Sequence, residues 1–131
     1  MSIRVLVAED GDVLRETLVA LLDLEDDLDV VAQIDTGDRI VPAALRHLPD
    51  VALLDIDLPG TDGLTAAAML RWRLPGCRVL ILTSLARPHN LDRALAVGVS
   101  GLLVKDGPVD DLIDAVRRIA RGEHVFADPM S

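Results

Sequence analysis

Aromatic residues are almost missing from this 131-residue sequence, which contains one tryptophan, Trp72, one phenylalanine, Phe126, and no tyrosine. Half of the residues are nevertheless hydrophobic. A chain of this length fits one domain with a sizeable core. We therefore expect a single domain whose core is built from aliphatic side chains.

Cysteine and long apolar runs are also scarce. Cys77 is the only cysteine, so the chain forms no internal disulfide and suits a reducing compartment. No apolar run is long enough to span a bilayer, and the first residues do not resemble a signal peptide. We expect a soluble, cytoplasmic protein with no membrane partner.

Basic residues are few, since 13 lysines and arginines stand against 22 acids and give a formal net charge of −9. A surface with this charge repels phosphate backbones. The polypeptide by itself is therefore a poor nucleic-acid binder.

Short aliphatic segments alternate with amphipathic segments along the whole chain. Their β-branched and apolar content predicts five strands, at residues 3–8, 29–34, 51–55, 78–83 and 101–105. A helical pattern follows each strand, most clearly at residues 109–120. This alternation predicts an α/β fold: a doubly wound five-stranded parallel sheet, (β/α)5, of the flavodoxin-like type, with right-handed crossovers.

The third predicted strand organises the chain. It is an uninterrupted apolar run between Pro49 and Pro59 that ends in Asp55. Such a run predicts a strand buried on both faces, as in a parallel sheet covered by helices. Asp55 should then lie at the carboxyl edge of the sheet, where open α/β folds place their chemistry.

Other polar residues fall at the ends of the other strands: Glu9 and Asp10 after the first, Thr83 at the end of the fourth and Lys105 at the end of the fifth. Three carboxylates that meet at one edge repel one another unless a cation lies between them. Mg²⁺ suits such a site because it takes oxygen ligands and keeps part of its water. A carboxylate can also attack phosphorus, and Mg²⁺, Lys105 and the Thr83 hydroxyl would stabilise the transferred group.

These positions resemble the receiver domains of bacterial two-component response regulators. The resemblance covers essentially the whole chain and rests on Glu9-Asp10, Asp55 with Pro59-Gly60, Thr83-Ser84 and Lys105. The segments at residues 86–88, 96–101 and 103–106 are most similar to the NarL/LuxR class. The resemblance implies a receiver fold in which Asp55 accepts phosphate from a sensor histidine kinase.

The resemblance also implies the parts around this acceptor. Mg²⁺ would be held by Glu9, Asp10, Asp55 and the backbone carbonyl of Asp57. Thr83 would act as a conformational switch together with the residue three positions before Lys105, which is usually aromatic in the family and is Leu102 here. The usual aromatic readout is therefore replaced by an aliphatic side chain.

The resemblance further implies a modular protein. Residues 1–122 form the receiver, and residues 123–131 begin a C-terminal linker to a helix-turn-helix DNA-binding domain in the intact regulator. Val13, Val19 and Leu24 lie off the main stripe of the first helix. Together with the last helix they are a candidate surface for a homodimer formed on phosphorylation.

Two alternative functions stay open at this point. Asp55 and Asp57 also match the D-x-D pair of haloacid-dehalogenase-type phosphatases, although that family places the pair after its first strand. The chain could also be a pseudo-receiver that binds partners without phosphorylation, although such proteins commonly lack an acid or the lysine. Taken alone, Glu9-Asp10 fits a polar turn before a helix better than a functional site. Asp55 taken alone could be a strand-end turn residue, although a buried carboxylate without a partner is costly.

Overall fold

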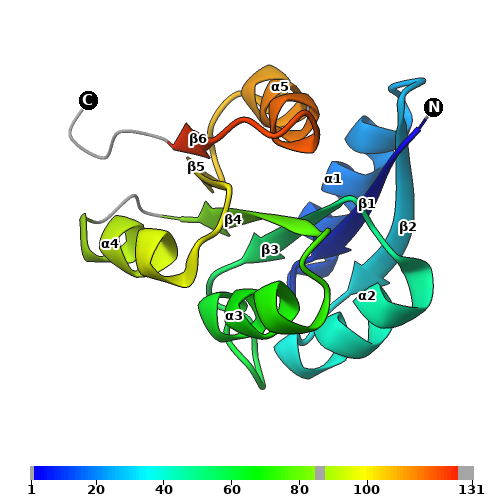
Figure 1. Cartoon of the computed structure of the whole chain (residues 1–131). Helices are drawn as coiled ribbons and strands as arrows, with labels where there is room; N and C mark the ends of the chain where they lie inside the picture. Colours follow the sequence, from blue (N-terminus) through cyan, green and yellow to red (C-terminus); the bar gives the residue numbers. More distant parts are fainter. Residues whose placement is uncertain (1, 85–87, 127–131) are drawn as a thin grey trace.

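The computed structural model describes residues 2–84 and 88–126, and its centre is one parallel sheet (Figure 1). Among these residues the strand order is β2-β1-β3-β4-β5-β6. The strands are β1 (Ile3–Ala8), β2 (Leu28–Ile34), β3 (Val51–Asp55), β4 (Arg78–Thr83), β5 (Gly101–Val104) and β6 (Val125–Phe126).

Helices cover both faces of the sheet, as the alternating pattern predicted. They are α1 (Asp12–Asp23), α2 (Ile40–His47), α3 (Gly63–Arg73), α4 (Pro88–Val97) and α5 (Val109–Ala120), with a 3₁₀ turn η1 (Gly37–Arg39) before α2. Figure 1 shows α1 and α5 on one face and α2, α3 and α4 on the other. The doubly wound α/β prediction is thus confirmed. Within the described ranges no helix combines the length and apolarity needed to cross a membrane.

The core consists of two aliphatic layers, one on each face of the sheet. Successive strand residues point to opposite faces, so Val5 and Val7 pack beneath α1 and α5, whereas Leu6 and Ala8 pack beneath the helices of the other face. All five residues of β3 are buried. The buried layers contain no aromatic side chain among the described residues, since Trp72 is exposed and Phe126 is only partly buried. The expectation of an aliphatic core is therefore met.

The sheet has one strand more than the sequence pattern predicted. After α5, Gly122 adopts a φ of 97° and turns the chain back along the open edge of β5. The Val125 amide donates to the Ser100 carbonyl at 3.0 Å, and Val125 and Phe126 pack on opposite faces. Two residues are too few to show a period, and the sequence pattern therefore predicts a linker at residues 123–131 and no strand there. Residues 127–131 lie outside the described part.

Candidate functional site

The carboxyl ends of four neighbouring strands meet at one edge of the sheet. Asp55 ends β3, Thr83 ends β4, and Glu9 and Lys105 directly follow β1 and β5. Because β1, β3, β4 and β5 are adjacent and parallel, the topology gathers side chains that lie far apart in the sequence. The residues selected from the sequence are therefore neighbours in the fold.

Three carboxylates form a tight cluster at this edge. One oxygen each of Glu9, Asp10 and Asp55 can be chosen so that all lie within 4.8 Å of one another. Glu9 and Asp55 are only 3% and 2% exposed, whereas Asp10 is exposed. The cluster is thus built on buried acids with one side open to solvent.

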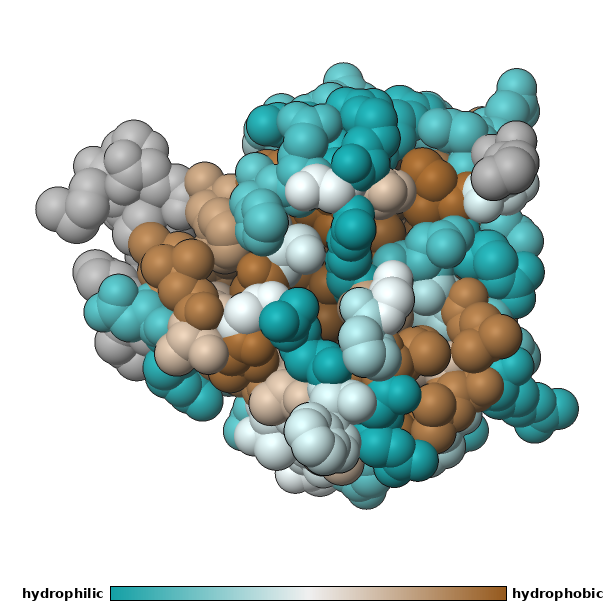
Figure 2. Space-filling model, in the orientation of Figure 1, coloured by the Kyte–Doolittle hydropathy of each residue, from teal (hydrophilic) through white to brown (hydrophobic). Residues whose placement is uncertain are grey.

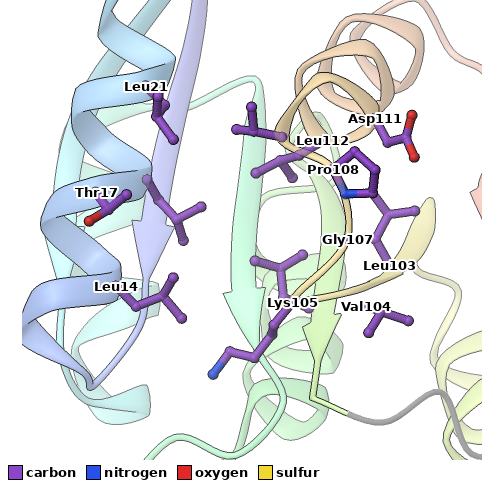
Figure 3. Close-up of a pocket in the computed structure, with 13 residues that line it drawn as sticks. Leu14, Thr17, Leu21, Leu103, Val104, Lys105, Gly107, Pro108, Asp111 and Leu112 are labelled. Atoms are coloured by element: carbon purple, nitrogen blue, oxygen red, sulfur yellow. The ribbon is translucent and has the colours of Figure 1, made fainter.

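Lys105 is the cation of this cluster. Its ammonium nitrogen lies 2.5 Å from Oε1 of Glu9 and donates a hydrogen bond of 3.0 Å to Oδ2 of Asp55. Figure 3 shows its side chain reaching from the end of β5 toward the tip of β3. One ammonium is therefore shared between two buried carboxylates from different strands.

The environment shifts the pKa values of two of these groups. Burial raises the pKa of Glu9, and the negative charge of Asp55 adds to this, although bonds from Lys105 and the Gly11 amide oppose it. For Lys105, burial disfavours the charge, but hydrogen bonds and attraction from Glu9 and Asp55 together outweigh burial and raise its pKa. Lys105 is consequently held in its charged form.

Backbone groups orient the two buried acids. The Gly11 amide donates to Oε2 of Glu9 at 2.8 Å, and Arg15 donates to the Glu9 carbonyl at 2.9 Å. The Asp57 amide donates to Oδ1 of Asp55 at 3.1 Å. Each carboxylate is thus fixed through one oxygen by the loop that follows its own strand.

Gly63, the first residue of α3, lets that helix begin against the end of β3. A Cβ at this position would lie 2.2 Å from the backbone oxygen of Asp55, and the Gly63 amide donates to the Ile56 carbonyl. Asp62 caps the helix by accepting from the Thr65 amide at 2.9 Å. The close approach requires a residue without a side chain.

The cluster has the chemistry of a site for a hard divalent cation. If all are ionised, three carboxylates and one ammonium leave a net charge of −2. Mg²⁺ prefers carboxylate oxygens and needs few of them, because water and phosphate complete its shell. The donor set Glu9, Asp10 and Asp55 therefore fits Mg²⁺. Asp57 lies in the adjoining turn, and its carbonyl stays a predicted ligand.

The two residues predicted to act as a switch lie close to this edge but in different surroundings. Thr83 is 2% exposed, and its carbonyl accepts from the Lys105 amide at 2.8 Å. Leu102 is fully buried in the aliphatic layer that also contains Ala94 of α4. Their switching role stays a prediction.

Sequence reasoning did not identify three contributors to the site. It did not pair Lys105 with Glu9, and it gave no role to Arg15 or Gly63. A glycine that follows soon after a strand-end acid was the only available signal for Gly63, and such glycines are common in turns. The ion pair with Glu9 leaves no trace in the local sequence.

A groove of about 310 Å³ opens beside the acidic edge. It lies between α1 and the segment that joins β5 to α5 (Figure 3). Aliphatic side chains form most of its wall, including Leu14, Leu21 and Leu103, and Lys105 lies at one end. The groove therefore connects the charged cluster with the surface of α1 and α5.

Comparison with known proteins gives a consistent picture. Residues 5–117 match the family described as response regulator receiver domain. The chain is 41% identical over 125 residues to the transcriptional regulatory protein DesR of Bacillus subtilis, covering 95% of this chain and 62% of that protein. It is 38% identical over 127 residues to a probable transcriptional regulatory protein NarL of Mycobacterium tuberculosis, covering 96% and 58%.

The fold is shared with solved structures. The signal receiver domain of the putative response regulator NarL from Mycobacterium tuberculosis has a TM-score of 0.89 at 36% identity, covering 93% of this chain and 98% of that one. The chain spans less than two thirds of the length of the curated relatives DesR and NarL. The similarity therefore concerns one part of those longer proteins.

Proposed function

The chain belongs to the response regulator receiver domain family and is a receiver of the NarL/LuxR type, and we propose that Asp55 accepts a phosphoryl group from a phosphohistidine of a sensor kinase. The proposal rests on one observation: Asp55 is buried at the sheet edge with Lys105 at 3.0 Å and with two further acids close by.

The transfer needs a nucleophile and charge neutralisation more than acid–base chemistry. An oxygen of Asp55 attacks phosphorus, an O–P bond forms, and the P–N bond of the phosphohistidine breaks with its electron pair returning to the imidazole. The product is an acyl phosphate on Asp55. Lys105 is placed to neutralise part of the added negative charge.

Glu9, Asp10, Asp55 and the carbonyl of Asp57 would hold Mg²⁺. When bound, the ion supplies positive charge that screens the acids from the incoming phosphoryl group. The Gly11 and Asp57 amides keep Glu9 and Asp55 oriented during the transfer. The exposed position of Asp10 leaves the cluster open to solvent.

The signal would leave the site through β4 and β5. Thr83 ends β4 and would donate its hydroxyl to a phosphoryl oxygen. The Lys105 amide donates to the Thr83 carbonyl, so a movement of Thr83 would be transmitted to the end of β5. Leu102 of β5 packs in the same layer as residues of α4. An aliphatic side chain would repack in place of a rotating ring.

The output of the intact regulator would be control of transcription. The two curated relatives are described as transcriptional regulatory proteins and extend beyond the region matched here. A C-terminal helix-turn-helix domain would bind DNA, and phosphorylation would favour a homodimer. Val13 and Leu24 are 80% and 74% exposed at the two ends of α1, whereas the apolar stripe of α5 is buried against the sheet. The exposed apolar residues for that contact would therefore come from α1.

Receiver domains are signalling proteins, and the family match gives no support to a phosphatase of the haloacid dehalogenase type. Asp55-Ile56-Asp57 follows the third strand here, and the acids after the first strand already belong to the same cluster. A pseudo-receiver is disfavoured because the acceptor, the acidic pair and the lysine are all present and adjacent.

The test is incubation with acetyl phosphate and Mg²⁺ followed by intact-mass measurement. We expect the mass of one phosphoryl group to be gained by the wild type and by Asp29→Asn, a control at an exposed acid of β2. Asp55→Asn should gain none, and EDTA should suppress the gain. A gain that persists in Asp55→Asn would place the acceptor elsewhere and refute the proposal.

A further inference from the structure

The helices on the two faces of the sheet differ in charge. α2 and α3 contain three arginines and a histidine but no acid, although the whole chain carries a net charge of −9. In contrast, α1 and α5 together contain six acids and three arginines. The surface over α2 and α3 is therefore a basic region on an acidic protein.

Large apolar side chains are exposed on the same two helices. Trp72, the only tryptophan, is 84% exposed on α3, and Met69, one turn earlier, is 46% exposed. Leu45 on α2 is 38% exposed. Met69 and Trp72 are three residues apart and so share one side of their helix.

The flanks of the two helices bring these side chains together. Met69 and Arg71 lie about 200° apart around α3, and Arg71 lies beside Gly98 at the end of α4. Met69 is therefore on the flank away from α4. Likewise Leu45 lies about 200° from Ala43, which lines a hollow on the β2 side of α2. Since α2 packs against α3, Leu45 and Met69 border the same seam.

We call Leu45, Met69 and Trp72 the α2–α3 patch, together with Arg73 beside them and Arg46 on the exposed outer side of α2, where Arg46 also lines the hollow toward β2. Figure 2 shows brown and pale atoms among the teal over these helices. Within residues 2–84 and 88–126, Arg46 and Arg73 form no ion pair. The patch thus combines an apolar ridge with two arginines that are not paired with an acid in the described part of the chain.

We propose that the α2–α3 patch docks an acidic amphipathic helix of a partner protein. Exposed tryptophan and arginine are the residues that most often dominate binding energy at interfaces. An apolar seam between two helices fits the apolar face of a third helix, and glutamates or aspartates beside that face would pair with Arg46 and Arg73. A two-fold contact between two copies would set the arginines of one patch against those of the other.

The test uses two labelled synthetic helical peptides that share one leucine face, one with glutamates and its twin with lysines on the other face. Fluorescence anisotropy measures their binding to the whole chain. We expect the glutamate peptide to bind at least about tenfold more tightly than its twin, and Trp72→Ala to weaken it at least about tenfold. Val13→Ala, an equally exposed position on α1, should leave it unchanged. The double variant Arg46→Glu with Arg73→Glu should reverse the preference.

Circular dichroism of each variant separates loss of binding from loss of folding, and Met69→Lys gives a second disruption of the ridge. Equal binding of the two peptides, or binding that survives both Trp72→Ala and Met69→Lys, would overturn the proposal. Self-association that disappears in Trp72→Ala would also overturn it in favour of a second copy. Preferential binding of phosphatidylglycerol vesicles would overturn it in favour of a lipid surface.

Discussion

The ammonium of Lys105 lies 3.0 Å from Oδ2 of Asp55, although the two residues are fifty positions apart in the chain. The same nitrogen lies 2.5 Å from Glu9. One cation therefore contacts two buried acids that arrive from different strands, and Lys105 is the only lysine in the sequence. Its removal leaves both acids without this counter-charge.

Lys105→Met should slow phosphorylation of Asp55 by acetyl phosphate by about a hundredfold, the usual effect of deleting one electrostatic stabiliser of a transferred group. The rate is measured by intact mass against time. Arg93→Met removes a cation from the exposed face of α4 and should leave the rate unchanged. An unchanged rate in Lys105→Met would show that the ammonium does not act on the phosphoryl group.

Mg²⁺ should raise the thermal unfolding temperature, because it binds the folded cluster and not the dispersed acids of the unfolded chain. At ten times its Kd the gain in the free energy of unfolding is about 1.4 kcal/mol, and EDTA should remove it. Asp10→Asn should abolish the shift, whereas Asp29→Asn should retain it. Differential scanning fluorimetry measures the unfolding temperature of each variant with and without Mg²⁺. Equal shifts in the two variants would mean that the ion binds elsewhere.

Gly63→Ala should lower the free energy of unfolding by about 3 kcal/mol, since the added Cβ would lie 2.2 Å from the Asp55 carbonyl oxygen. It should also slow phosphorylation, because relief of the clash moves the end of β3. Gly76→Ala is the matched control, as a Cβ there meets nothing within 4 Å. Urea unfolding measures the free energy of unfolding of both variants. Equal values would contradict the close approach of α3 to the end of β3.

Cys77 should be unreactive toward iodoacetamide in the folded protein at pH 8 and should react after denaturation in urea. Burial raises the pKa of its thiol from 9.0 to about 12, with Asp50 adding to the effect, and the residue is 2% exposed. Mass spectrometry of native and denatured samples measures the difference.

The same thiol predicts a loss of stability at high pH. Because its pKa is raised in the folded state, its contribution is complete below pH 9 and falls as the pH rises toward 12. Cys77→Ala should therefore show a smaller decline of unfolding free energy over this interval than the wild type. Identical slopes would mean that the thiol is not buried as described.

Local sequence pattern was sufficient for the elements that carry the site. The run before Asp55 was predicted as a strand buried on both faces, and all five residues of β3 are buried. The rule that parallel strands end at one edge was enough to place Glu9, Asp10, Thr83 and Lys105 near Asp55. The rule was sufficient because it needs only the hydrophobic pattern of each segment and the order of the segments along the chain, and both can be read from the sequence.

Contacts between residues far apart in the chain could not be predicted from the sequence. β6 forms only because the edge of β5 is open to pairing. The close approach at Gly63 depends on the position of α3 relative to the end of β3. The seam between Leu45 and Met69 depends on how α2 packs against α3. None of these has a periodic signal of its own.

The alternation of elements, the aliphatic core and the residues at each strand end can be predicted from the amino-acid sequence, because they follow from propensity and burial along the chain. The bridge from Lys105 to Glu9 and Asp55, and the shared surface of basic and apolar residues on α2 and α3, emerge only when the chain is folded. The reason is physical: Coulomb forces and packing act over distances in space, and separation along the chain does not report those distances.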